Sequence, residues 1–547
     1  MTRIYTSIAN IAIFNPHQTN RWQIGLILIL GLLLRLGGIQ HGLPYVYDPD
    51  EPIFMWYAEQ IVVNKDLNPH WFGHPGSTTI YLLAILYASI FIIGYLAGNF
   101  QTTWDLRLFC DQDPTLIYLL SRGTMLVFGV VTVLLVFLLA RRLFSHNTAL
   151  LAAGILAITP LHVHYSKFVR TDIQATFWVV LAFWFCLNIV EKGCWRDYLL
   201  AGAMTGIATA TKYPAALIFA SIIIAHLLIR NWDPSHQIKL ISSGLASFAA
   251  MFASSPYLFL DYRTTLSNIS DEIIFHPLAA ERNTQFFKNL VWYLQVPLAK
   301  SFTWIGLILI GTGIILCFRQ RQKSGYLLAS FPIIFLLFIS SNKLYWERWV
   351  IIALPFLSTL LAYAATETVQ WISQRWRSMP SGWVYAAWLL IIIIPLFVSS
   401  LKDSVTLATP DTRTLAAEWI LNNIPPGSNL AVEWYSPSLP KEAFNYFYIN
   451  DLGNLVRFDP QNYYKKLYTP YGKLGDINDL QSIQDQDIAF IVMSNLYDRY
   501  LLTPKSHPEI IEKYEAIMEL GKLVFSARPE PWKTQGVTIR IYQVKTR

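Results

Sequence analysis

Charged residues are scarce in this sequence. Only 14% of its 547 residues are Asp, Glu, Lys or Arg, and 54% are hydrophobic, whereas soluble proteins carry about 25% charged residues. Cysteine is also rare, and the four residues Cys110, Cys186, Cys194 and Cys317 have no paired spacing typical of a disulfide framework or a zinc site. The composition therefore argues against a soluble protein, and the cysteines argue against redox chemistry.

Long apolar runs take the place of charge. A helix needs about 20 mostly apolar residues to cross the hydrocarbon core of a bilayer. Candidate runs lie near 22–40, 77–98, 118–140, 149–165, 173–190, 197–211, 214–230, 237–256, 301–318, 326–341, 348–366 and 383–401. The first run follows two arginines and ends without a small-residue cleavage motif, so we expect it to remain as an anchor. The sequence predicts a polytopic α-helical membrane protein with about 11–13 transmembrane helices.

The net charge of +7 does not indicate nucleic-acid binding. The basic residues are spread over many loops, and the enrichment of Lys and Arg in cytoplasmic loops explains much of this distribution. We expect lipid, and not nucleic acid, to surround this protein.

The hydropathy changes after Ser400, so the sequence predicts a membrane domain over 1–402 and a soluble α/β domain over 403–547. Helical periodicity is seen in 412–423 and around 496–519. Strand-like runs lie at 429–435, 487–494, 522–527 and 537–544. This domain contains no glycine-rich phosphate loop and no nucleophile motif, which favours a cap or scaffold.

Two topologies remain open. If the amino terminus is cytoplasmic and run 77–98 lies along the membrane, basic clusters such as Arg141-Arg142 and Arg319 to Lys323 fall inside, as the positive-inside rule requires. Segment 257–300 and the soluble domain then face outward together with the acidic loop described next. If run 77–98 crosses, Asp50 and Asp172 lie on opposite sides of the membrane.

The first outward loop carries three acids, Asp48, Asp50 and Glu51, directly after the first span. Acids at a membrane face are costly and are usually functional. A carboxylate can act as the general base for an incoming hydroxyl nucleophile. The alternative is structural, because Asp50 could cap the helix that follows it.

Cations follow at the ends of later spans. Arg170 stands beside Asp172, Lys212 follows another span, and Lys343 and Arg348 flank Tyr345. Each cation could reach toward lipid headgroups. Gathered on one face, they could instead stabilise a departing lipid phosphate. The two histidines of Pro160-Leu-His-Val-His point to different helix faces, so we predict no metal site there.

The chain resembles the lipid-carrier-dependent glycosyltransferases of the GT-C fold, the group that contains the protein O-mannosyltransferases and the transferase that adds aminoarabinose to lipid A. The matching pieces are Asp50-Glu51, His74-Pro75, Arg141-Arg142-Leu-Phe, Pro160-Leu-His-Val-His-Tyr-Ser-Lys with Asp172, Thr211-Lys212, and Lys343 to Arg348 with Leu354-Pro355-Phe. Their order and their placement relative to the spans carry the resemblance, which covers most of 20–400.

The resemblance implies a role for each matching residue. Asp50 takes the place of the catalytic aspartate, Asp172 looks like a second acid that orients substrate, and the carrier phosphate is contacted by Lys212, Lys343 and Arg348. The substrate-binding set is completed by Glu51, His74, Arg170 and Tyr345. Many relatives have His-Pro-Pro where this chain has His74-Pro75-Gly76, so the role of His74 stays open.

The expected activity is transfer of a sugar from a polyprenyl-phosphate carrier to a lipid, glycan or protein acceptor, with inversion at the anomeric carbon. The expected location is a bacterial inner membrane with the soluble domain outside. A divalent metal is possible. One alternative is a flippase for lipid-linked sugar, although no internal repeat is visible. The other is a ligase or polymerase that uses a lipid pyrophosphate.

Overall fold

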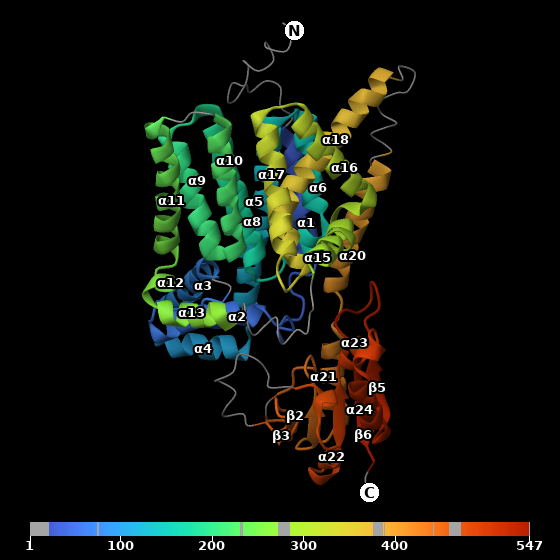
Figure 1. Ribbon diagram of the computed structural model, residues 1–547. Coiled ribbons are helices and arrows are strands. Elements are labelled where there is room, and N and C mark those ends of the chain that lie inside the picture. The colour runs from blue at the N-terminus through green and yellow to red at the C-terminus, as the bar shows by residue number, and fades with distance from the viewer. Residues whose placement is uncertain are drawn as a thin grey trace.

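Apolar segments of the chain form long helices that stand side by side in the upper half of Figure 1, above a smaller domain that contains a sheet. The structure is a computed structural model that describes residues 21–73, 76–229, 233–271, 285–375, 387, 389–440, 442–458 and 472–545. His74, for which we predicted a substrate contact, lies outside the described residues.

The helices of the membrane region alternate with short connections along the chain. They are α1 (Arg21–Leu36), α2 (Glu51–Asn64), α3 (Ser77–Leu96), α4 (Thr103–Gln112), α5 (Thr115–Leu143), α6 (His146–Ile158), α7 (Pro160–Tyr165), α8 (Thr171–Lys192), α9 (Trp195–Thr211), η1 (Tyr213–Ile218), α10 (Phe219–Ile229), α11 (Pro234–Ser254), α12 (Tyr257–Leu260), α13 (Tyr262–Ser270), α15 (Phe286–Tyr293), η3 (Leu294–Leu298), α16 (Ala299–Arg319), α17 (Lys323–Ser340), η4 (Glu347–Ala353), α18 (Leu354–Arg375), η5 (Leu389–Ile393) and α20 (Ile394–Leu407).

Seven helical segments among the described residues are long and apolar enough to cross a membrane. They comprise α3, α5, α8, α15 to α16, α17, η4 to α18, and η5 to α20. Three shorter apolar segments, in α1, α6 and η1 to α10, stand among them. The prediction of a polytopic α-helical membrane protein is therefore confirmed.

Small residues allow α9 and α11 to approach closely. A Cβ on Gly202 would collide with the carbonyl oxygen of Ser243, and one on Gly206 would collide with that of Ser247. The two glycines are four residues apart on one face of α9, the spacing used where membrane helices bring their backbones together.

The predicted run 149–165 is broken in the structure. Thr159 has an extended backbone with ψ of 119°, because a residue before proline is displaced from the helical region. Pro160 then occupies the first position of α7, where its missing N–H costs no helical hydrogen bond. The break redirects α7, which carries His162 and His164, away from the axis of α6.

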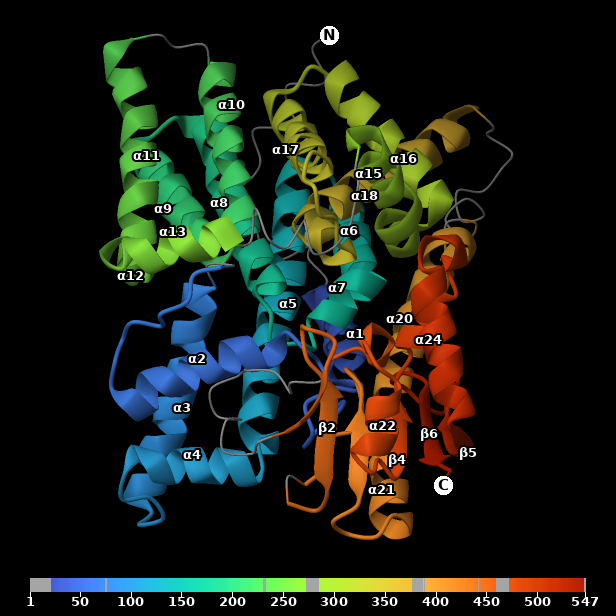
Figure 2. The same cartoon turned by 60° about the horizontal axis from the view of Figure 1, so that its bottom comes forward.

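Helices α2, α3, α4, α12 and α13 form a layer below the long helices, on the side of the soluble domain (Figures 1 and 2). Several hydrogen bonds join this layer together, including the Asn68 amide to Asp261 at 3.0 Å and the backbone N–H of Phe72 to Asn268 at 2.9 Å. The position of α3 in this layer favours the topology in which run 77–98 does not cross, although its length and hydropathy alone fit a span.

The soluble domain is a mixed sheet with helices on both faces. Its elements are α21 (Thr412–Asn423), β1 (Asn429–Val432), β2 (Asn445–Ile449), β3 (Leu455–Arg457), η7 (Leu474–Asp476), α22 (Gln481–Asp485), β4 (Phe490–Met493), α23 (Leu496–Tyr500), η8 (Pro504–Ser506), α24 (Pro508–Glu519), β5 (Gly521–Ala527) and β6 (Ile539–Val544). The strand order is β3-β2-β1-β4-β6-β5, with β1 parallel to both β2 and β4 and the other pairs antiparallel.

Successive side chains along each strand point to opposite faces of the sheet, so the hydrophobic core of this domain has two halves. Leu430 and Val432 pack with α21 on one face of the sheet, whereas Ala431 packs with Tyr514 and Ile517 of α24 on the other. Side chains of successive strand residues point to opposite faces, so both helices are needed to cover the sheet.

Candidate active site

The loop between α1 and α2 is fixed to the membrane helices by a buried ion pair. Arg122 of α5 donates from Nε and Nη2 to the two carboxylate oxygens of Glu51 at 2.9 and 2.6 Å, and both side chains have no exposed surface. Nη1 of Arg122 donates to the carbonyls of Ile39 and His41 at 2.7 and 2.9 Å. The N–H of Val169 also donates to Glu51 at 2.8 Å. Glu51 therefore supports the loop and does not line a surface that a substrate reaches.

Asp48, and not Asp50, caps helix α2. One carboxylate oxygen of Asp48 accepts hydrogen bonds from the backbone N–H groups of Asp50 at 2.9 Å and Glu51 at 3.1 Å. Arg170 donates to both oxygens of Asp48, at 3.0 and 2.8 Å. Burial alone would raise the pKa of Asp48, but Arg170 and the two N–H groups outweigh it and hold this pKa below its ordinary value.

Asp50 precedes α2 but makes no side-chain capping hydrogen bond. Its carboxylate instead pairs with Arg170, and Nη1 of Arg348 lies 3.4 Å from the same oxygen. The side chain of Asp50 is 34% exposed, compared with 11% for Asp48, 4% for Asp172 and none for Glu51. Asp50 is thus the acid of this group most open to an incoming molecule.

Asp172 lies in the first turn of α8 and pairs with Lys212, which follows α9. Both side chains are largely buried, and Arg170 and Arg348 lie close enough to act on both charges. At the same place, Thr211 and Thr78 share a hydrogen bond of 2.7 Å, which joins the end of α9 to the start of α3.

The acids and cations of four chain segments thus form one charge cluster, defined as Asp48, Asp50, Arg170, Asp172, Lys212 and Arg348. Three negative and three positive side chains alternate in it, as buried charges require. Among the described residues, no group of three His, Cys, Asp or Glu side chains could hold a metal ion. A metal would have to displace the cations that already pair with the acids, so this cluster does not fit a metal site.

Of the other predicted residues, Lys343 is exposed and Tyr345 is half-buried with its ring centroid 4.5 Å from that of Trp292. Glu347, which separates this segment from Arg348, accepts a hydrogen bond from the hydroxyl of Tyr165 at 3.3 Å. The positions of Lys343 and Tyr345 as substrate contacts stay predictions.

A second polar network lies beside the cluster and was not predicted. Asp403 of α20 accepts from His164 at 2.8 Å and from Lys167 at 3.1 Å. Fully buried Arg35 of α1 lies 2.7 Å from Nδ1 of His162 and donates to Ser166 at 3.2 Å. The polar residues that follow Pro160 therefore tie α7 to α1 and α20. The signal that could have found this network is Arg35 itself, a charge inside an otherwise apolar run.

The soluble domain touches the first loop directly. The guanidinium of Arg413 lies 4.0 Å from the ring centroid of Tyr47 and donates to the carbonyl of Tyr47 at 3.2 Å. The hydroxyls of Tyr47 and Thr414 are 3.2 Å apart. Since Tyr47 immediately precedes Asp48, helix α21 rests on the chain segment that carries the acids. This contact places the cluster at the end of the membrane region nearest the soluble domain.

Part of the chain matches a known family. Residues 116–259 match the model of the family described as "Dolichyl-phosphate-mannose-protein mannosyltransferase". This range includes Arg122, Arg170, Asp172 and Lys212. YkcB of Bacillus subtilis, named "Putative mannosyltransferase YkcB", is 29% identical over 131 residues, which cover 24% of this chain and 18% of YkcB. The chain thus matches less than a fifth of the length of that relative.

Solved structures are similar over almost the whole chain. ArnT from Cupriavidus metallidurans, in a crystal structure bound to undecaprenyl phosphate, matches with a TM-score of 0.50 at 12% identity, covering 95% of this chain and 97% of ArnT. The apo oligosaccharyltransferase of Archaeoglobus fulgidus matches with a TM-score of 0.48 at 13% identity, covering 95% of this chain and 76% of that chain. The resemblance predicted from the sequence is confirmed at the level of fold, since this chain has the GT-C fold.

Proposed function

We propose that this protein is an integral-membrane glycosyltransferase that moves a sugar from a polyprenyl-phosphate carrier to an acceptor on the extracytoplasmic face, with Asp50 as the general base. The observation that carries the proposal is the state of Asp50. Its carboxylate makes no capping bond, keeps an exposed surface and contacts arginines from two other segments of the chain.

The depth of the cluster supports a lipid-linked donor. Arg170 precedes the first residue of α8, and Arg348 lies at the second residue of η4, so both cations stand where a membrane segment begins. A phosphate at the end of a polyprenyl chain lies at this level of the bilayer. ArnT, which shares the fold, binds undecaprenyl phosphate, and the matched family is described by a dolichyl-phosphate-mannose donor.

The opposite end of the helices supports the proposed orientation. Arg122 lies near the start of α5, and Arg141 and Arg142 lie about 30 Å further along the helix at 1.5 Å per residue. Arg142 pairs with Glu191 near the end of α8 at 2.7 Å, so these helix ends meet away from the cluster. Basic residues at span ends favour the cytoplasmic side, which leaves the cluster and the soluble domain outside, as in a bacterial inner membrane.

The proposed step is a single displacement. The acceptor hydroxyl oxygen attacks the anomeric carbon, and the bond from that carbon to the phosphate oxygen breaks. The bonding electrons leave with the carrier phosphate, while Asp50 takes the hydroxyl proton. Attack from the face opposite the leaving group inverts the configuration. A leaving phosphate needs positive charge and not a proton, which is the role we assign to Arg348 and Lys343, with Asp172 and Lys212 orienting the substrate.

The resting ion pairs of Asp50 fit this step. Nη1 of Arg348 lies 3.4 Å from the Asp50 carboxylate. When a carrier phosphate takes up Arg348, the Asp50 carboxylate loses one of its two arginine partners and is free to face the acceptor hydroxyl. The same arginine would thus serve the base before the donor binds and the leaving group afterwards.

The test is Asp50→Asn in purified protein, reconstituted into lipid nanodiscs and supplied with polyprenyl-phosphate mannose and other polyprenyl-phosphate sugars. Loss of a general base lowers the rate by about 10²–10⁴. Mass spectrometry measures the product, and NMR of its anomeric proton reports inversion. Asparagine caps helices as well as aspartate, so a merely structural Asp50 would leave transfer nearly intact.

Asp66→Asn is the matched control. Asp66 lies in the next outward loop, its side chain is 49% exposed, and its carboxylate lies 2.9 Å from Nε2 of His70. Normal transfer by this variant beside a dead Asp50→Asn, with equal thermal stability, would support the proposal. Near-normal turnover by Asp50→Asn would remove Asp50 from the mechanism.

A further inference from the structure

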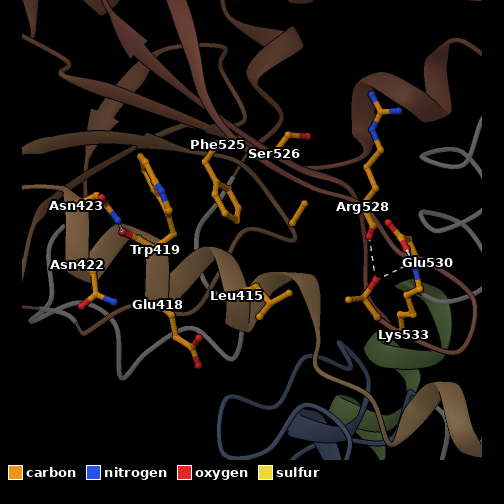
Figure 3. Close-up of a pocket in the computed structure, with 12 residues that line it drawn as sticks. Leu415, Glu418, Trp419, Asn422, Asn423, Phe525, Ser526, Arg528, Glu530 and Lys533 are labelled. Atoms are coloured by element: carbon orange, nitrogen blue, oxygen red, sulfur yellow. Dashed lines mark hydrogen bonds and ion pairs between the residues drawn. The ribbon is translucent and has the colours of Figure 1, made fainter.

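The soluble domain carries a groove that the proposed reaction does not use. It runs between α21 on one side and the end of β5 with the segment that follows it on the other, and it has a volume of about 560 Å³ (Figure 3). Binding sites for small molecules fall at about 300–1,000 Å³, so the groove is large enough for a ligand of several rings. It lies outside the charge cluster and shares no residue with it.

One wall of the groove is a single stripe of α21. Leu415, Trp419 and Asn422 are spaced by four and three residues, so they lie on one face of the helix. Phe525 of β5 faces them, with its ring centroid 5.3 Å from that of Trp419 and an angle of 29° between the rings. Figure 3 shows these two rings side by side, with polar side chains on either side of them.

The polar side chains of the groove balance in charge. Two acids, Glu418 and Glu530, stand with two bases, Arg528 and Lys533. Lys533 already donates to Glu530 at 3.0 Å. This balance fits a neutral ligand better than a phosphate, an acidic peptide or a nucleic acid.

Three planar groups in the groove remain available to a ligand. The side chains of Glu418, Asn422 and Arg528 make no hydrogen bond to another described residue. A carboxylate, an amide and a guanidinium can each bond two neighbouring hydroxyls at once. Aromatic faces are electron-rich and attract the polarised C–H groups on one side of a sugar ring. Flat aromatic rings flanked by such planar groups therefore suit a saccharide.

The groove leads toward the first loop. The groove ends at Leu415. The preceding residue, Thr414, has its hydroxyl 3.2 Å from that of Tyr47. From Leu415 to Asn423 the helix rises about 12 Å, which accommodates a short run of sugar rings. A saccharide held along α21 would point one end at the loop that carries Asp50.

We infer that this groove binds the saccharide part of the acceptor. The inference rests on the proposed function and narrows its acceptor to a glycan or a glycan-bearing molecule. Trp419 and Phe525 would provide the stacking surface, while Glu418, Asn422 and Arg528 would bond the hydroxyls.

Binding is tested on the full-length protein in lipid nanodiscs, because glycoside detergents would compete. The probes are short oligosaccharides of mannose, of glucose and of N-acetylglucosamine, followed by saturation-transfer NMR. Asn422→Ala is expected to weaken binding by about two- to tenfold, the range for one hydrogen bond, and Trp419→Ala by more. Trp532→Ala is the control, since Trp532 is 46% exposed but does not line the groove.

Two outcomes would overturn the inference. In one, no oligosaccharide binds the wild-type protein, or a neutral unstructured peptide binds the groove in its place. In the other, oligosaccharides bind Asn422→Ala as well as they bind the wild type. Asn422 is an exposed helix position, so its replacement keeps the domain folded, and a loss of binding in Trp419→Ala alone would then reflect unfolding.

Transfer assays separate this inference from the proposed function. Asp50→Asn should bind oligosaccharide like the wild type but fail to transfer, whereas Asn422→Ala should raise the acceptor KM and leave kcat unchanged. If saccharides bind but no donor supports transfer, the proposed function is refuted, whereas the assignment of the groove as a saccharide site stands. Normal acceptor KM in Asn422→Ala would refute the groove and keep the proposed function.

Discussion

The buried pair of Glu51 and Arg122 allows a prediction whose magnitude follows from its contacts. Glu51→Gln removes the negative charge but keeps the shape and one acceptor oxygen, which can still bond the N–H of Val169 at its present 2.8 Å. The amide nitrogen would then face the donors of Arg122, and the two bonds of 2.9 and 2.6 Å would not both survive. Breaking one side of a fully buried ion pair costs about 3–5 kcal/mol.

Reversible unfolding in mixed micelles, followed by circular dichroism, measures this loss. The matched control is Glu191→Gln, because Glu191 also pairs with an arginine, Arg142, at 2.7 Å but its side chain is 48% exposed. An exposed pair contributes at most about 1 kcal/mol. The double variant Glu51→Gln with Arg122→Met should lose less than the sum of its single variants, because no buried charge is left unpaired. A loss below about 1 kcal/mol in Glu51→Gln, or losses that simply add, would refute the reasoning.

Three further predictions follow. Arg413→Ala removes a cation–π contact of 4.0 Å to the first loop, worth about 1–2 kcal/mol, so kcat should fall several-fold. It should partly recover in Arg413→Lys, which keeps a cation beside Asp411, and an unaltered kcat would show that the soluble domain does not position the loop. Burial raises the pKa of Glu59 from 4.5 to about 7, so the folded state binds a proton at Glu59 more tightly than the unfolded state does, and the free energy of unfolding should fall as the pH rises from 4.5 to about 7. Glu59→Gln should flatten this dependence on pH, and an unchanged slope would contradict the assignment. In spheroplasts, a membrane-impermeant thiol reagent should label a cysteine at Leu452, which is 76% exposed, but neither the exposed Cys194 nor a cysteine at Gln320, and the reverse pattern would contradict the orientation.

The membrane region could be predicted because lipid imposes one rule on every span. A crossing segment must be apolar and about 20 residues long, and this rule located most of the long helices within a few residues. The rule does not report whether a long apolar helix crosses the membrane or lies along it. α3 passes the same test of length and hydropathy as the spans, and only its contacts with α2 and the end of α9 place it in the layer below the long helices.

The soluble domain was predicted in part. The sequence located α21 and the central strands β1 and β4, whose continuous apolar residues are typical of strands buried on both faces. It did not predict β2 and β3. The run Asn445–Ile449 contains polar and aromatic residues with no clear alternation, and β3 has only three residues, Leu455–Arg457. Both strands exist because β1 offers β2 a parallel partner, and pairing between distant segments leaves no local pattern.

The site shows the same limit for charges. The sequence indicated which acids and cations stand at span ends, where charges are rare, but it could not indicate how they pair. The alternative prediction made Asp50 the cap of the following helix, whereas in the structure Asp48, two residues earlier, accepts the capping hydrogen bonds. It grouped Arg348 with Lys343 for their spacing, while the contact of Arg348 is with Asp50, about 300 residues away. It passed over Arg122, although an arginine inside an apolar run must find a partner. A residue type and its depth in the membrane are local properties, whereas the pairing that decides which acid is free to act depends on how distant helices pack.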